Sequence, residues 1–141
     1  MTDTYYSPPR DIAAKIKRRL VQARATRPAR LKLGEGALSI CFDDFPRSAA
    51  EHGASILERH GGRATFYAAA GLAEQDGPCG INFSAHDLVR LSGAGHEIGC
   101  HTYAHEDCAK VDVYEALIDL ARNRDALAEM GYQGQLQSLA Y

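Results

Sequence analysis

Short apolar runs and helical patterns alternate along most of the chain. Mostly apolar runs that predict buried β-strands lie at residues 37–42, 63–70 and 96–100. Helical patterns lie between and after them, at residues 48–60, 84–92 and 111–130. A further apolar run begins at Leu136 and continues to Tyr141. This alternation of strands and helices predicts an α/β fold with about four parallel strands.

Polar residues and glycines indicate where these helices begin and end. Ser48 is followed three residues later by Glu51, the spacing of a capping box, so we expect Ser48 to cap the first helix. Ser84 is expected to cap the second helix. Gly61–Gly62 should end the first helix, and Gly131 should end the third.

The beginning of the chain follows a different pattern. Ile12, Ile16 and Leu20 recur at four-residue intervals and therefore lie on one side of a predicted helix. We expect residues 1–36 to form a basic helix with an extended lead-in, and residues 37–141 to form a separate α/β domain.

The formal net charge of −2 hides an uneven distribution. Residues 1–32 contain nine Lys or Arg and two Asp or Glu, which gives +7, whereas residues 33–141 contain seven and sixteen, which gives −9. A basic segment of this kind is compatible with binding to nucleic acid or to an anionic membrane. The apolar stripe and the lack of a nucleic-acid motif favour a helix that packs or docks on a partner, with no nucleic acid bound.

Neither a signal peptide nor a membrane span is predicted, so we expect a cytoplasmic protein without a transmembrane segment. Reduced thiols are the default in that compartment. The cysteines contain no close-spaced pair and are Cys41, Cys79, Cys100 and Cys108.

Chemically reactive side chains directly follow two of the predicted strands. Asp43–Asp44 follow the first strand, and His101 follows the third, with His105 four residues later. In parallel sheets and barrels, functional residues lie at the carboxyl ends of the strands. Two carboxylates and two imidazoles can supply a metal site and a general base, the combination of metal-assisted hydrolysis. The plainer alternative is a pair of turn aspartates and a pair of surface histidines.

Two residues close to these histidines in the sequence suggest further roles. Thr102 lies between the histidines and can hydrogen-bond to a ring or to the loop, which is a supporting role that metal sites require. Cys108 follows His105 by three residues, so a structural zinc site of His101, His105 and Cys108 stays open as an alternative. The remaining histidines are expected to lie on the surface or to be structural, with Glu97 supporting local hydrogen bonds.

Two segments resemble motifs of one enzyme family. Ser39–Asp44 (SICFDD) resembles the first motif of the polysaccharide deacetylases, also called the NodB-homology or carbohydrate esterase family 4 proteins. Gly95–His105 (GHEIGCHTYAH) resembles the second motif, with its His-Ser/Thr-x-x-His core, and Ala64–Tyr67 (ATFY) is similar to the family's second strand. The resemblance covers residues 37–141 and implies a partial (β/α) barrel of the NodB-homology type, preceded by the N-terminal basic helix.

The resemblance also implies roles for the reactive side chains. Asp44 would be the metal-binding aspartate, with His101 and His105 as its partner ligands. Asp43 would be the general base that activates water. The implied cofactor is a divalent metal, zinc first, with cobalt, nickel or manganese as alternatives. The implied reaction is hydrolysis of N- or O-linked acetyl groups on an acetylated carbohydrate.

The chain also departs from the family pattern. The first motif usually continues with Gly, but Phe45 follows here, and we expect its bulk at the mouth of the site to narrow substrate choice. The family's later motifs are absent, and Leu139–Tyr141 resembles the start of the third. We therefore expect an N-terminal fragment that is a poor enzyme alone and self-associates through an unpaired sheet edge. The alternatives are a hydrolase of a small cyclic amide on the same fold, or an inactive fragment that binds metal or a partner.

Overall fold

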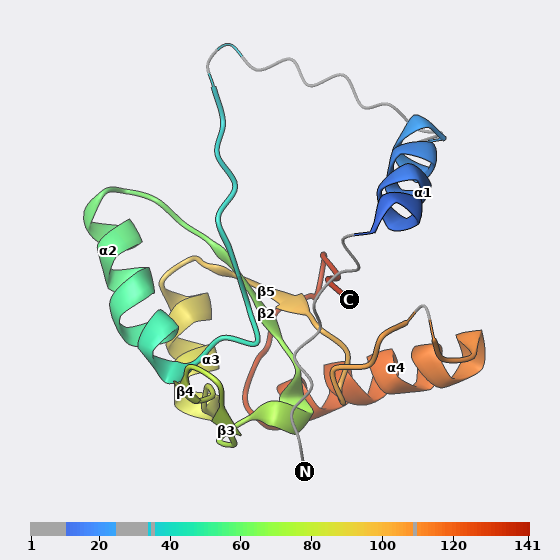
Figure 1. Ribbon diagram of the computed structural model, residues 1–141. Coiled ribbons are helices and arrows are strands. Elements are labelled where there is room, and N and C mark those ends of the chain that lie inside the picture. The colour runs from blue at the N-terminus through green and yellow to red at the C-terminus, as the bar shows by residue number, and fades with distance from the viewer. Residues whose placement is uncertain (1–10, 25–33, 35, 109) are drawn as a thin grey trace. The chain divides into compact units, whose positions relative to one another are not determined.

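The computed structural model describes residues 11–24, 34, 36–108 and 110–141. The chain separates into two compact units, residues 1–37 and residues 38–141. Among the described residues, the first unit contains helix α1, and the second contains the strands and the remaining helices (Figure 1).

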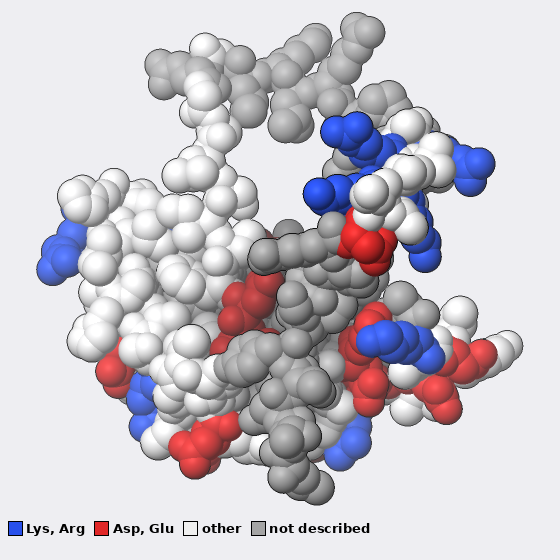
Figure 2. Space-filling model, in the orientation of Figure 1, with Lys and Arg blue, Asp and Glu red and all other residues white. Residues whose placement is uncertain are grey.

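Helix α1 (Ile12–Ala23) is the helix that the N-terminal pattern predicts. Its stripe residues Ile12, Ile16 and Leu20 are all more than half exposed. Lys and Arg side chains gather on the same helix (Figure 2), so α1 is an amphipathic basic helix. In the part of the chain that the structure describes, no helix is both long and apolar enough to cross a membrane.

A three-stranded parallel sheet forms the centre of the second unit. Its strands are β1 (Cys41–Asp43), β2 (Thr65–Ala68) and β5 (Glu97–Cys100), and their order is β1-β2-β5. The register places Asp43, the last residue of β1, beside Tyr67, the next-to-last residue of β2. The carboxyl ends of the strands therefore lie at one edge of the sheet.

The end of the chain adds a fourth parallel segment beside β5. Leu139 forms a parallel bridge with Cys100. The Cys100 N–H donates to the Ser138 carbonyl, and the Ala140 N–H donates to the Cys100 carbonyl. The predicted α/β fold with parallel strands is therefore confirmed.

Helices follow the three strands in turn. After β1 come a π-helical turn, η1 (Ala49–Gly53), and α2 (Ala54–Arg59); α3 (Ala85–Gly93) lies between β2 and β5, and α4 (Val113–Glu129) follows β5. The segment before α3 contains the 3₁₀ turn η2 (Ala70–Leu72) and a small antiparallel hairpin of β3 (Asp76–Gly77) and β4 (Gly80–Ile81). Figure 1 shows α2 and α3 close together and α4 apart from them.

The capping predictions have different outcomes. Ser84 caps α3 as predicted, in a capping box with Asp87. The prediction for Ser48 is wrong, because its backbone is already helical (φ −61°, ψ −31°) and its side chain makes no cap hydrogen bond. The Ala49 N–H donates to the Pro46 carbonyl, so helical hydrogen bonding begins at the proline and includes Ser48. Proline starts a helix well because it needs no donor there.

The expectation that Phe45 lies at the mouth of the site and narrows substrate choice is wrong, because Phe45 lies in the core. Its side chain is fully buried. The ring stacks on Phe83, with ring centroids 4.5 Å apart, and meets Phe66 edge to face at 5.0 Å. The preceding Asp44 has a left-handed φ of 42°, which turns the chain after β1 and directs the next side chain into the core. Such aromatic pairs add about 0.5–1.5 kcal/mol beyond burial.

The predictions for Glu97 and for the histidines outside the candidate site are confirmed. Glu97 accepts hydrogen bonds from the hydroxyls of Thr65 and Ser138, each at 2.7 Å, so it links three neighbouring strands. His96 is buried, and its Nδ1 accepts from the Ala64 N–H at 3.1 Å. Its Nε2 then carries the proton and donates to Glu58 Oε1 at 3.0 Å. His96 therefore has a structural role, as expected, while the side chains of His52, His60 and His86 are exposed.

The His96–Glu58 contact predicts a dependence of stability on pH. The hydrogen bond from His96 lowers the pKa of Glu58 below its usual value of 4.5. A carboxyl with a lowered folded-state pKa stabilises the fold fully above its unfolded-state pKa, and this contribution disappears as the pH falls through the folded-state value. We expect Glu58→Gln to be less stable than the wild type at pH 7, with a difference that shrinks below about pH 4.5.

Urea unfolding of both proteins between pH 3 and pH 7 measures this difference. Glu129→Gln is the matched control, because Glu129 is exposed at the end of α4. A difference between wild type and Glu58→Gln that stays constant over this range would contradict the assignment.

Candidate metal centre

Three side chains with metal-ligating atoms meet at the carboxyl ends of β1 and β5. Asp44 directly follows β1, His101 directly follows β5, and His105 lies in the loop after it. One ligand atom from each lies within 4.8 Å of the others. The topology therefore brings together two segments that lie almost sixty residues apart in the sequence.

The distances within this group suit a single small cation. His101 Nε2 lies 3.4 Å from Asp44 Oδ1, and His105 Nε2 lies 3.1 Å from Asp44 Oδ2. Tetrahedral ligands, each about 2.0–2.1 Å from zinc, are roughly 3.3 Å from one another. Both carboxylate contacts are close to that separation.

A hydrogen bond at the other ring nitrogen of His101 selects the neutral tautomer whose Nε2 can bind a cation. His101 Nδ1 lies 2.9 Å from the Ala140 carbonyl, which can only accept, so Nδ1 carries the proton of the neutral ring. Nε2 then presents a lone pair to Asp44 Oδ1, which is buried and has no hydrogen-bond partner. A buried acceptor that faces another acceptor is unfavourable unless a cation lies between them. The residues therefore fit a bound metal ion.

Burial falls across the group from one ligand to the next. The side chain of His101 is 6% exposed, that of Asp44 is 35% exposed, and that of His105 is 51% exposed. The centre is therefore anchored in the body of the domain and open to solvent beside His105. An ion held by three protein ligands at an open centre keeps coordination positions for water and substrate, as catalytic sites need.

Left-handed backbone is concentrated at this centre. Asp44 (φ 42°), Thr102 (φ 59°) and His105 (φ 57°) are three of the four described non-glycine residues with positive φ. Each such residue costs of order 1–3 kcal/mol, which surrounding contacts must offset. Strain of this kind clusters at functional sites.

Thr102 is fully buried between the two histidines. Its hydroxyl oxygen accepts from the Glu106 N–H at 2.8 Å, which closes the loop that presents His105. The hydroxyl therefore fixes the loop and not a ring, and these were the two possibilities that the sequence left open.

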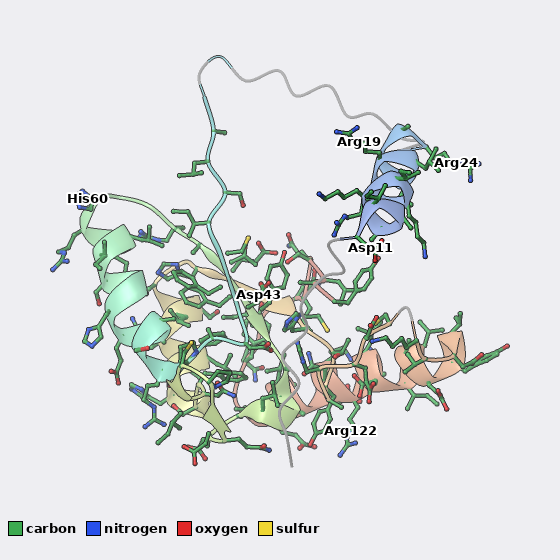
Figure 3. The ribbon with its side chains drawn as sticks, viewed as in Figure 1. Asp11, Arg19, Arg24, Asp43, His60 and Arg122 are labelled. Atoms are coloured by element: carbon green, nitrogen blue, oxygen red, sulfur yellow. The ribbon has the colours of Figure 1, made fainter. Side chains whose placement is uncertain are left out.

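Asp43 ends β1 and is exposed (Figure 3). It is not part of the three-residue group, although it is adjacent to Asp44 in the chain. Cys108 is also outside the group, so the alternative zinc site of His101, His105 and Cys108 has no support in the structure.

Sequence reasoning missed Asn123, which ties α4 to the strand ends. Asn123 is fully buried, and its Nδ2 donates to the Ala68 carbonyl at 2.9 Å, while its Oδ1 accepts from the Ala70 N–H at 2.8 Å. A signal was present in the sequence, because Asn123 lies between Leu120 and Leu127 at the spacing of the apolar stripe. A polar residue in such a stripe indicates a buried hydrogen-bonding role.

The chain belongs to the polysaccharide deacetylase family, because the family's sequence model matches residues 30–141. A comparison with curated proteins found no match.

The fold of this chain is similar to that of three solved structures. IcaB from Ammonifex degensii is 22% identical, with a TM-score of 0.61 over 73% of this chain and 48% of that one. The family 4 carbohydrate esterase from Streptomyces lividans, in complex with acetate, is 21% identical, with a TM-score of 0.59 over 74% and 50%. The chitin deacetylase from Colletotrichum lindemuthianum is 25% identical, with a TM-score of 0.54 over 65% and 39%. The chain thus spans half or less of the length of these structures.

Proposed function

We propose that this chain forms the metal-binding part of a hydrolase that removes N- or O-linked acetyl groups from a carbohydrate. The observation that carries the proposal is the group of Asp44, His101 and His105 at the strand ends. Family membership supports it, as do the names of two structural neighbours, a chitin deacetylase and a carbohydrate esterase in complex with acetate. In this proposal residues 37–141 are the hydrolase domain, and residues 1–36 lie outside it.

One carboxylate oxygen and two imidazole nitrogens would hold the cation. This donor set suits zinc first, and also cobalt, nickel or manganese. When bound, a divalent cation supplies Lewis-acid polarisation of a carbonyl and activation of water. The Ala140 carbonyl keeps His101 in the tautomer that offers Nε2 to the cation.

The remaining residues would act on the proton and on the loop. Asp43 would accept a proton from the water that attacks the acetyl carbonyl, since it is a carboxylate adjacent to Asp44 and outside the ligand group. Thr102 would keep His105 in place through its hydrogen bond with the Glu106 N–H. The side chains of Asp43 and His105 are exposed, so both would be accessible to a carbohydrate.

A metal titration combined with an acetate-release assay tests the proposal. We expect the metal-free chain to bind one zinc or cobalt ion, and His105→Ala to bind it much more weakly. His52→Ala is the matched control, because His52 is exposed in η1, outside the ligand group. Acetate release is then measured on an N-acetylated and an O-acetylated oligosaccharide, with and without a chelator.

The two measurements separate the parts of the proposal. Absence of metal binding by the wild type would overturn the metal centre. Metal binding without acetate release from either substrate would leave the centre intact and contradict the hydrolase assignment for this chain.

A further inference from the structure

The loop that carries His105 is held by a carboxylate from a different element, helix α4. We propose that Asp119 is a positioning residue that fixes residues 102–105 and thereby sets the affinity of the centre for its metal. This inference rests on the metal centre of the proposed function and assigns part of its affinity to a residue outside the ligand group.

Asp119 binds two consecutive backbone N–H groups of the loop. Its Oδ2 accepts from the Tyr103 N–H at 2.5 Å and lies 3.4 Å from the Ala104 nitrogen, which also donates to it. Hydrogen bonds to an ionised carboxylate are shorter and roughly twice as strong as neutral ones. The donors belong to the two residues midway between the ligands His101 and His105, so the carboxylate acts on the part of the loop that sets their spacing.

The other groups of Tyr103 are also fixed, which leaves the loop little freedom while Asp119 is in place. The Tyr103 carbonyl accepts from the Gly71 N–H at 3.0 Å. A Cβ on Gly71 would lie only 2.5 Å from that carbonyl oxygen, so the close approach requires glycine. On the ring side, the guanidinium carbon of Arg122 (labelled in Figure 3) lies 3.7 Å from the Tyr103 centroid. Asp119 and Arg122 are one helical turn apart on α4, so one face of the helix holds both the backbone and the ring.

The loop needs these external contacts because its own backbone is unfavourable. Thr102 and His105 both have left-handed φ, at 59° and 57°, and they bracket the two residues whose N–H groups Asp119 accepts. Residues with Cβ atoms leave this region when nothing holds them there. Without Asp119, the contacts that still hold this loop include the Thr102 hydroxyl bond at its carboxyl end, the Tyr103 contacts and the approach of His105 to Asp44.

Loss of the Asp119 hydrogen bonds should weaken metal binding mainly through His105. His101 is buried and oriented by the Ala140 carbonyl, a contact that does not involve α4. His105 is half exposed, and its ring reaches Asp44 only while the loop keeps its conformation. Outer-sphere groups that orient a ligand typically contribute 10–100-fold to metal affinity.

The experiment compares Asp119→Asn with Asp125→Asn in the full chain. Asparagine keeps the size of the side chain and one acceptor oxygen but removes the charge. Asp125 lies on the same helix, is exposed, and bonds to the adjacent Arg124, so it controls for loss of one acidic residue from α4. Cobalt affinity is measured by titration, and hydrogen exchange at Tyr103 and Ala104 is measured in the metal-free protein.

We expect Asp119→Asn to bind cobalt about 10–100-fold more weakly than the wild type and to exchange these two amide hydrogens faster. Asp125→Asn should match the wild type in both measurements. Equal thermal unfolding midpoints of the metal-free variants would show that the effect is not a general loss of stability.

Two results would overturn the inference. Cobalt affinity of Asp119→Asn within twofold of the wild type would remove the positioning role and leave the metal centre of the proposed function standing. Absence of cobalt binding by the wild type would remove the metal centre itself, and the role of Asp119 in metal affinity with it.

Discussion

Replacing Asp44 by alanine is expected to abolish metal binding and acetate release together. Asp44 is the one anionic member of the group, and its two oxygens face the Nε2 atoms of both histidines, at 3.4 Å and 3.1 Å. Its removal leaves two neutral imidazoles and no carboxylate to neutralise the ion. We expect metal affinity to fall by more than about 100-fold, since even outer-sphere partners contribute 10–100-fold. Metal content after dialysis and a direct titration measure the loss.

Asp44→Asn is the control that separates ligation from backbone strain. Asp44 has a φ of 42°, a conformation that asparagine tolerates and alanine does not. The asparagine variant should therefore keep the fold and still lose most of the metal, because a neutral amide oxygen replaces a carboxylate. Asp76→Asn, in the exposed hairpin, should retain wild-type metal content. Wild-type zinc content in Asp44→Asn would contradict the ligand assignment.

The location of this centre could be predicted from the sequence because it depends on topology. Parallel strands that alternate with helices align their carboxyl ends, so residues that directly follow two such strands must lie close together. Asp44 and His101 meet this condition, and β1 and β5 are held in one sheet by β2. His105 follows His101 by four residues, and the loop between them places both rings beside Asp44.

Features that depend on one local turn could not be predicted in this way. Phe45 follows a reactive aspartate and so was expected at the mouth of the site, but the left-handed Asp44 reverses the direction of the next side chain. Ser48 has the sequence of a cap, but Pro46 starts the helix two residues earlier. In both cases a single backbone conformation decides the outcome, and residue types alone do not fix it.

The backbone partners of the polar residues on α4 could not be predicted from the sequence pattern either. Asn123 and Asp119 reach backbone groups of β2 and of the loop after β5, more than ten residues away along the chain. Only the packed position of the helix determines which backbone groups a polar side chain meets. The residues that gather at the strand ends are therefore easier to predict than the residues that hold them in place.

Replacing Asp43 by asparagine is expected to leave metal content unchanged and to lower acetate release by ~10²–10⁴-fold. Asparagine keeps the size of the side chain but cannot accept a proton from water at neutral pH. Asp43 lies outside the ligand group, so the change should not weaken the site for the ion. Asp43 is exposed at the end of β1, and surface substitutions of this kind usually change stability little, so the fold should be retained.

The comparison of Asp43→Asn with Asp44→Asn makes this prediction specific. The two substitutions remove the same charge from adjacent residues at the same strand end, so a change in local electrostatics alone would affect both variants alike. Different roles predict a different result: Asp43→Asn should be metal-loaded and slow, and Asp44→Asn should be metal-free and inactive. Metal content and initial rate of acetate release, measured on the same samples, distinguish these cases. Equal metal loss in the two variants would show that Asp43 is a ligand, and unchanged acetate release by Asp43→Asn would show that another group accepts the proton.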